Sequence, residues 1–322
     1  MIPGLIFLII ILSLVLIKSA EMVIVAIRRI AKEAHAGLFT ISAIVLALGT
    51  SLPELFVGIT SSLEKSSSLS LGVVLGSNIA NIALVAGLSA FFMGKVNIKS
   101  DYLKREVGIA LAAGTLPLVL VIDGVISRID GFILITIYFA YAFGFFRHRF
   151  IQIGKEQQEE GFIYRFLREF KHIESIRARE FGRLFLGVAF LIFSSDAIVK
   201  LSSRLATEAH IPIFLVGLFI LAIGTSLPEL AFSFRSLEDH EPSMFFGNIL
   251  GSIIVNATLI VGLSALIYPI RIEIGEYLTA ATAFFVVFAS FWLFIRSKHR
   301  LDRWEAASLL ILYFVFIIVE FV

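Results

Sequence analysis

The sequence of 322 residues contains no cysteine. Disulfide bonds, thiolate metal sites and cysteine nucleophiles are therefore excluded. Charged residues are also scarce, since Asp, Glu, Lys and Arg together make up 16% of the chain. The 27 basic residues nearly balance the 25 acidic ones, so no excess of positive charge indicates a nucleic-acid partner. We expect no nucleic-acid binding.

Apolar residues are abundant instead. They form 58% of the chain, and the mean hydropathy of +0.96 is too high for a soluble globular domain. Segments long enough to cross a bilayer as helices fall roughly at 3–27, 38–62, 69–93, 107–122, 131–146, 184–204, 213–234, 244–268, 275–295 and 304–322. We therefore predict an all-α membrane protein with ten transmembrane helices, whose 32 phenylalanines mostly face the lipid bilayer.

An internal repeat organises these segments. The phrase Gly-Thr-Ser-Leu-Pro-Glu-Leu occurs at 49–55 and again at 224–230, an offset of 175 positions. The same offset pairs Ser19 with Ser194, Gly76 with Gly251, Ser77 with Ser252 and Asn81 with Asn256. Each copy holds an odd number of predicted crossings, so the second copy must enter the membrane upside down. The prediction is two inverted-topology five-helix repeats, 1–146 and 184–322, joined by a connecting loop at 147–183.

The orientation follows from the basic residues, which are retained on the cytoplasmic side. With the N-terminus outside, most Lys and Arg residues, including those of the 147–183 loop, fall inside. We expect a multi-pass protein of the cell membrane with this loop in the cytoplasm. Ile163, Phe166, Phe170 and Ile173 recur at helical spacing in the loop, which indicates either an amphipathic helix on the inner membrane surface or a solvated linker.

Oxygen-bearing side chains gather within the apolar segments. Ala47, Thr50, Ser51 and Glu54 are spaced by three or four residues and share one helix face. Pro53 has no N–H to donate, which leaves the Gly49 carbonyl without its usual donor. The second repeat reproduces this arrangement, and the following segments add two further pairs. These candidates are Ala222, Thr225, Ser226, Glu229, Ser77 with Asn81, and Ser252 with Asn256.

The chemistry of this set favours a hard cation. An ionised carboxylate in an apolar span costs about 2.5 kcal/mol or more unless it is compensated. Oxygen donors without imidazole or sulfur suit calcium and sodium, and are wrong for zinc or copper. The alternative role for the small and amide residues is helix packing and interhelical hydrogen bonding. For Glu21 and Asp196, with Lys18 and Lys200 nearby, helix-internal ion pairs are favoured over ion binding.

The paired phrases, each followed by a Gly-Ser…Asn segment, resemble the α-repeats of the calcium/cation antiporter superfamily and are similar to prokaryotic sodium/calcium exchangers. The resemblance implies four ion sites between the second, third, seventh and eighth helices, with Glu54 and Glu229 as principal calcium ligands shared with sodium. It implies that the sites are completed by Thr50, Ser51, Ser77, Asn81, Thr225, Ser226, Ser252, Asn256 and the carbonyls of Ala47 and Ala222.

Two positions depart from the superfamily pattern. Asn256 stands where aspartate is often found, which argues against potassium co-transport, and Ile253 replaces the asparagine that follows Gly-Ser in the first repeat. The function implied is a secondary antiporter that exchanges calcium for sodium, with no enzymatic activity and no cofactor besides the transported Ca2+ and Na+. A monomer is the simplest assembly. The alternatives are a calcium/proton antiporter, in which the glutamates titrate, and, from other classes, a cation channel or an intramembrane hydrolase.

Overall fold

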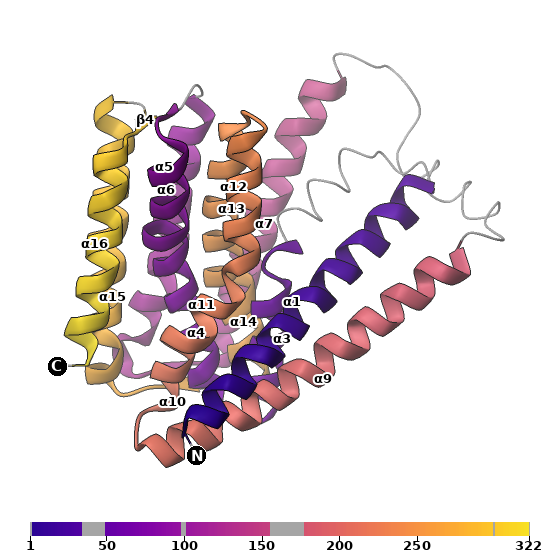
Figure 1. Cartoon of the computed structure of the whole chain (residues 1–322), viewed down its shortest axis with the longest axis vertical. Helices are drawn as coiled ribbons and strands as arrows, with labels where there is room; N and C mark the ends of the chain where they lie inside the picture. The colour runs from indigo at the N-terminus through magenta and orange to yellow at the C-terminus, as the bar shows by residue number, and fades with distance from the viewer. Residues whose placement is uncertain (1, 34–48, 98–100, 155–176, 299, 322) are drawn as a thin grey trace.

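The computed structural model describes residues 2–33, 49–97, 101–154, 177–298 and 300–321, which are almost entirely helical (Figure 1). The elements of the N-terminal part are α1 (Ile2–Glu33), α3 (Leu52–Leu63), α4 (Ser67–Ala80), η1 (Asn81–Val85), α5 (Ala86–Met93), β1 (Val96–Asn97), α6 (Asp101–Leu120), η2 (Val121–Asp123), β2 (Val125–Ile126) and α7 (Arg128–Gly154). Those of the C-terminal part are α9 (Arg177–Ala209), α10 (Ile213–Leu215), η4 (Val216–Leu221), α11 (Ala222–Thr225), α12 (Leu227–Glu238), α13 (Pro242–Ile254), η5 (Val255–Ile260), α14 (Val261–Ile267), β3 (Ile270–Arg271), α15 (Ile274–Lys298), β4 (Arg300–Leu301) and α16 (Arg303–Glu320).

Helices cover the predicted apolar segments. In the described part of the chain, seven are long and apolar enough to cross a membrane: Ile2–Ile27, Ser67–Met93, Glu106–Asp123, Arg179–Ala209, Ile213–Glu238, Pro242–Ile267 and Tyr277–Arg296. Helix α3 covers the later part of the predicted span 38–62, α7 covers 131–146, and α16 covers the predicted span 304–322 as far as Glu320. Both α7 and α9 continue into the predicted 147–183 loop. The pattern at 163–173 lies outside the described residues.

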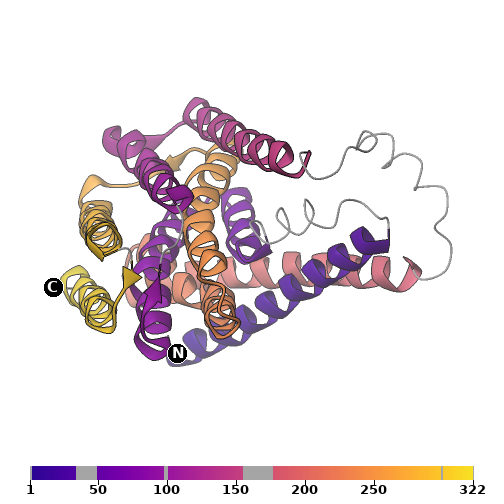
Figure 2. The same ribbon diagram turned by 90° about the horizontal axis from the view of Figure 1, so that it is seen from above.

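Helices α1 and α9 form a pair that leans away from the other helices toward the upper end of Figure 1 (Figures 1 and 2). They are joined at that end by an ion pair of Arg29 with Glu180, at 2.9 Å. The pair contrasts with α5, α6, α12, α13, α15 and α16, which stand closer to upright in Figure 1. The first and second parts of the chain therefore each contribute one long helix to the same tilted layer.

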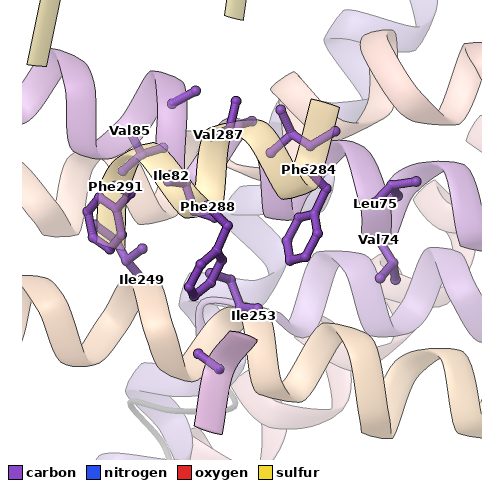
Figure 3. Close-up of a cluster of buried hydrophobic side chains, with 14 of the residues drawn as sticks. Val74, Leu75, Ile82, Val85, Ile249, Ile253, Phe284, Val287, Phe288 and Phe291 are labelled. Atoms are coloured by element: carbon purple, nitrogen blue, oxygen red, sulfur yellow. The ribbon is translucent and has the colours of Figure 1, made fainter. Parts of the chain in front are cut away.

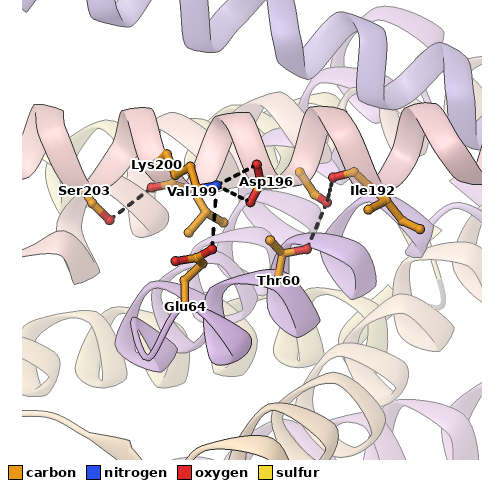
Figure 4. A network of polar contacts seen from close by, with 8 residues as sticks. Thr60, Glu64, Ile192, Asp196, Val199, Lys200 and Ser203 are labelled. Atoms are coloured by element: carbon orange, nitrogen blue, oxygen red, sulfur yellow. Dashed lines mark hydrogen bonds and ion pairs between the residues drawn. The ribbon is translucent and has the colours of Figure 1, made fainter.

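A polar network joins the lower part of α9 to α3 (Figure 4). The hydroxyls of Thr60 and Ser195 lie 3.0 Å apart. Lys200 contacts Asp196 at 2.9 Å on its own helix and reaches Glu64, the residue after α3, at 3.8 Å. The predicted helix-internal ion pair of Lys200 with Asp196 is confirmed, as is that of Lys18 with Glu21, at 2.8 Å.

Short strands cross between the two parts of the chain at both ends of the bundle. Strand β1 pairs antiparallel with β4, with Val96 opposite Leu301, and β2 pairs antiparallel with β3, with Val125 opposite Arg271. Each pair takes one strand from the first predicted repeat and one from the second. The two parts therefore interlock and do not stand as separate units.

A cluster of aromatic and aliphatic side chains fills the space between α4, α13 and α15 (Figure 3). The prediction that phenylalanines mostly face lipid is wrong for its members and their neighbours, since several are fully buried: Phe214, Phe245, Phe246, Phe284, Phe288 and Phe291. Others are exposed on the surface as predicted, among them Phe7 and Phe185. Large rings bury enough area to fill the gaps between crossing helices, which hydropathy alone does not reveal.

Helix α4 approaches the segment α10–η4 backbone to backbone. A Cβ atom on Gly72 would lie 2.2 Å from the carbonyl oxygen of Phe214, and one on Gly76 would lie 2.1 Å from that of Leu218. Only glycine fits at such crossings, as in other close helix pairs of membrane proteins. The contact brings the residues that follow Gly76 against the helix break at the end of α11.

Candidate functional site

The repeated phrase interrupts its helix in both places. Before α3, Ser51 has φ −88° and ψ 8°, and between α11 and α12, Ser226 has φ −82° and ψ 0°. Pro53 and Pro228 lie in the first turn of the new helix, where a missing N–H leaves no intrahelical bond unmade. The phrase therefore starts a new helical segment inside the bundle, and each glutamate lies in the first turn of that segment.

Glu54 lies fully buried, with 0% of its surface exposed. The Ser77 hydroxyl of α4 donates to its Oε1 at 3.5 Å, and Thr225 of α11 contacts the same carboxylate. These two hydroxyls lie 3.3 Å from each other. Its other oxygen, Oε2, has no hydrogen-bond partner among the described residues.

Glu229 is equally buried, at 0% exposure, and its surroundings mirror those of Glu54. The hydroxyls of Thr50 and Ser252 face its carboxylate and lie 3.5 Å from each other. Neither Oε1 nor Oε2 has a partner in full hydrogen-bonding geometry within the part of the chain that the structure describes. Each carboxylate thus meets a serine from its own predicted repeat and a threonine from the other.

The two buried carboxylates lie near enough for the charge of Glu54 to bear on Glu229. Like charges at short range repel strongly where water is excluded. The pair is therefore stable in its ionised form only with positive charge close by. In the described ranges no cluster of three or more His, Asp or Glu residues offers an alternative metal centre.

Several further predicted site residues have polar atoms without partners, which is rare for buried groups. Within the described residues these atoms are the hydroxyls of Ser51 and Ser226, both amide atoms of Asn81 and the Oδ1 of Asn256. All four residues are buried. The starts of the two glutamate-bearing helices and the π-helical turns after α4 and α13 thus hold buried polar atoms without partners.

Of the two backbone carbonyls predicted for the site, the structure describes that of Ala222. The Ala222 oxygen accepts the Ser226 N–H at 3.0 Å and the Thr225 hydroxyl at 3.4 Å. It retains no fully free lone pair, so it is a weaker candidate ligand than the side chains. Ala47 lies outside the described residues.

Two asparagines that the sequence analysis did not select belong to the same cluster. Asn248 Oδ1 accepts the Thr50 hydroxyl at 3.1 Å, and Asn78 Oδ1 accepts Nδ2 of Asn256 at 3.1 Å. Asn248 lies four residues before Ser252 on α13, so the helical spacing that linked Ser252 to Asn256 would also have found it. The search through repeat partners missed it because Val73 stands at the equivalent position.

Comparison with known proteins agrees with this geometry. A family model described as sodium/calcium exchanger protein matches residues 4–147 and 180–322. The sodium/calcium exchanger MaX1 of Methanosarcina acetivorans is 29% identical over 98% of this chain and 98% of its own length. The inner membrane protein YrbG of Escherichia coli is 32% identical over 71% of this chain and 69% of its own length.

Solved structures show the same fold. The sodium-calcium exchanger NCX_Mj, soaked with Na+ and Sr2+, superposes with a TM-score of 0.62 at 24% identity, covering 98% of this chain and 99% of that one. A second soak gives a TM-score of 0.60 at 25% identity, covering 97% of both chains. The matched segments include every candidate site residue. This multi-pass membrane protein therefore belongs to the sodium/calcium exchanger family.

Proposed function

We propose that the chain is a secondary antiporter that expels calcium from the cell in exchange for sodium. The observation that carries the proposal is the pair of fully buried carboxylates, Glu54 and Glu229, whose charges act on one another and whose helical segments also hold buried polar atoms without partners. Calcium takes six to eight oxygen ligands, and its double charge matches two glutamates. Sodium ions would share the same oxygens, so the two loads compete for one cavity.

The proposed ligands come from both repeats. Glu54 and Glu229 supply the charge, and neutral oxygens complete the coordination of calcium and sodium. These neutral ligands are Thr50, Ser51, Ser77, Asn81, Thr225, Ser226, Ser252, Asn256 and the carbonyls of Ala47 and Ala222. The crossed contacts of the glutamates with threonines of the opposite repeat support a site shared between the halves.

We also infer ten crossings in two inverted repeats, 1–146 and 184–322. Features at the sequence offset of 175 support this inference. Lys65 and His240 both have left-handed backbones, with φ 59° and 58°, and η1 and η5 are both π-helical. Both ends of the chain lie toward the lower edge of Figure 1, as an even number of crossings requires. Such repeats place a site near the midplane and expose it alternately to each side.

The distribution of basic residues sets the proposed orientation. With the N-terminus outside, the ends of α1, α12 and α15 that carry Arg29, Arg235 and Arg296 face the cytoplasm. The 147–183 connection then lies on the same side. The polar network of α9 with α3 (Figure 4) lies at the opposite, outer end.

Transport into proteoliposomes tests the proposal. We expect calcium-45 uptake driven by an outward sodium gradient at fixed pH, and we expect Glu54→Gln to abolish it because half of the site's charge is removed. Glu64→Gln is the matched control, since it makes the same change at an exposed carboxylate on the same helical segment, and it should transport like the parent.

Three results would contradict the proposal. Full exchange by Glu54→Gln would remove this carboxylate from the site. Uptake driven equally well by a proton gradient without sodium would identify a calcium/proton antiporter. Calcium flux that needs no counter-ion, with channel-sized currents in planar bilayers, would identify a channel.

A further inference from the structure

One amide contact joins the two predicted repeats beside the glutamates. Asn78 lies near the end of α4 and Asn256 lies in η5, and both are buried. Nδ2 of Asn256 donates to Oδ1 of Asn78 at 3.1 Å. Asn78 is not among the residues to which the family resemblance assigns a ligand role.

This contact fixes which way the Asn256 amide faces. The oxygen and nitrogen of a carboxamide diverge from one trigonal carbon, the oxygen as an acceptor and the nitrogen as a donor. With Nδ2 held by Asn78, Oδ1 must face away from Asn78, and it has no partner among the residues that the structure describes. A cation binds the oxygen of an amide and is repelled by its N–H groups. The contact therefore leaves Oδ1 of Asn256, the atom that can bind a cation, free of Asn78.

The repeat partner of Asn256 has no such support. Both Nδ2 and Oδ1 of Asn81 lack partners in the described ranges. The position equivalent to Asn78 is Ile253, whose side chain packs in the apolar cluster with Phe284 and Phe288 (Figure 3). An isoleucine offers no acceptor, so one site amide is held and the other is free to turn.

We propose that Asn78 is a positioning residue that holds the carboxamide of Asn256 with its oxygen toward the bound cation. The proposed ligands of the two repeats are alike in kind but differ in preorganisation. The Asn256 oxygen is oriented before an ion binds, whereas the Asn81 amide is ordered only on binding. This inference rests on the proposed function, in which Asn256 is a ligand.

A double-mutant cycle tests the proposal. The variants are Asn78→Leu, which has similar volume but no acceptor, Asn256→Ala, and the two combined, with equilibrium binding of calcium-45 to the full-length protein in detergent as the measurement. We expect Asn78→Leu to weaken binding by about 10- to 100-fold, the range for residues that orient metal ligands. Because Asn78 acts through Asn256, Asn78→Leu should change little in the Asn256→Ala background.

The controls separate positioning from packing. Ile253→Val trims the equivalent position in the other repeat and should bind calcium like the parent, and gel filtration checks that each variant is folded. If Asn78→Leu does not fold, Asn78→Ala takes its place in the cycle. Unchanged affinity in a folded Asn78 variant, or additive losses in the double variant, would overturn the role of Asn78. Unchanged affinity in Asn256→Ala would instead contradict the proposed function at that position.

Discussion

Glu54 and Glu229 show how a repeat builds a site from mirrored contacts. Each meets a serine of its own repeat and a threonine of the other, through Ser77 with Thr225 and Ser252 with Thr50. The correspondence between the repeats does not extend to Asn78 and Asn248. Their repeat partners are Ile253 and Val73, which are apolar. The proposed site is therefore symmetric in its two glutamates and asymmetric in the side chains that contact its neutral residues.

At the residue scale, we predict that Asn248→Val raises the KM for calcium about tenfold. A threonine hydroxyl can offer its oxygen to a cation only when its proton is directed elsewhere, and Asn248 accepts the proton of Thr50. Sodium-driven calcium-45 uptake at graded calcium concentrations measures the effect. Val73→Ala, at the equivalent position of the other repeat, should leave the KM unchanged. A parent-like KM in Asn248→Val would contradict the role given to Thr50.

The paired residues of the proposed site could be selected from the sequence because each has a repeat partner of the same kind. An ionisable residue inside an apolar segment is already unusual, and finding Glu54 and Glu229 at equivalent positions made both stand out. The supporting asparagines could not be found in this way, since their counterparts are apolar. Only the three-dimensional contact of Asn78 with Asn256 reveals that role.

At the scale of elements, the close crossing of α4 with η4 decides where Ser77 lies. The crossing depends on glycine, because a Cβ on Gly76 would meet the backbone of Leu218. Hydropathy located the helices that the structure describes, but it did not locate the breaks at Ser51 and Ser226, nor the π-helical turns at Asn81 and Val255. Breaks and π-turns depend on backbone hydrogen bonding, and a count of apolar residues carries no information about it.

We predict that Gly76→Ala destabilises the protein by about 3 kcal/mol, the upper end of the usual range for overpacking, because the carbonyl it meets cannot rotate away. The midpoint of thermal melting in detergent should fall clearly. Gly108→Ala on α6 is the control: a Cβ there meets nothing within 4 Å, and alanine favours a helix over glycine by up to about 1 kcal/mol. Parent-like melting of Gly76→Ala would contradict the close crossing.

At the scale of the whole molecule, the strand pairs β1–β4 and β2–β3 tie the two parts of the chain together at both ends. These contacts join residues far apart in sequence, and strands of two residues carry too little pattern to be predicted. The fold class followed from composition and the repeat. The strand pairing between the two parts of the chain could not be predicted from composition and the repeat. The burial of phenylalanines such as Phe288 could not be predicted either, because both features depend on how the helices cross.

Inversion of the repeats predicts that equivalent residues lie on opposite sides of the membrane. Glu64 and Asp239 are such a pair, with side chains 45% and 52% exposed, and the chain has no cysteine of its own. A membrane-impermeant maleimide added to intact cells should label Glu64→Cys, and should label Asp239→Cys only after lysis. The parent protein gives the background. Labelling of both variants from outside would contradict the inverted architecture.

The most direct measurement is anomalous diffraction from crystals soaked in strontium, a calcium substitute visible near its absorption edge. We expect one strong peak in contact with the carboxylates of both Glu54 and Glu229, and its loss in crystals of Glu229→Gln. A peak that touches neither carboxylate, or carboxylates turned away from each other with no ion between them, would contradict a shared cation site.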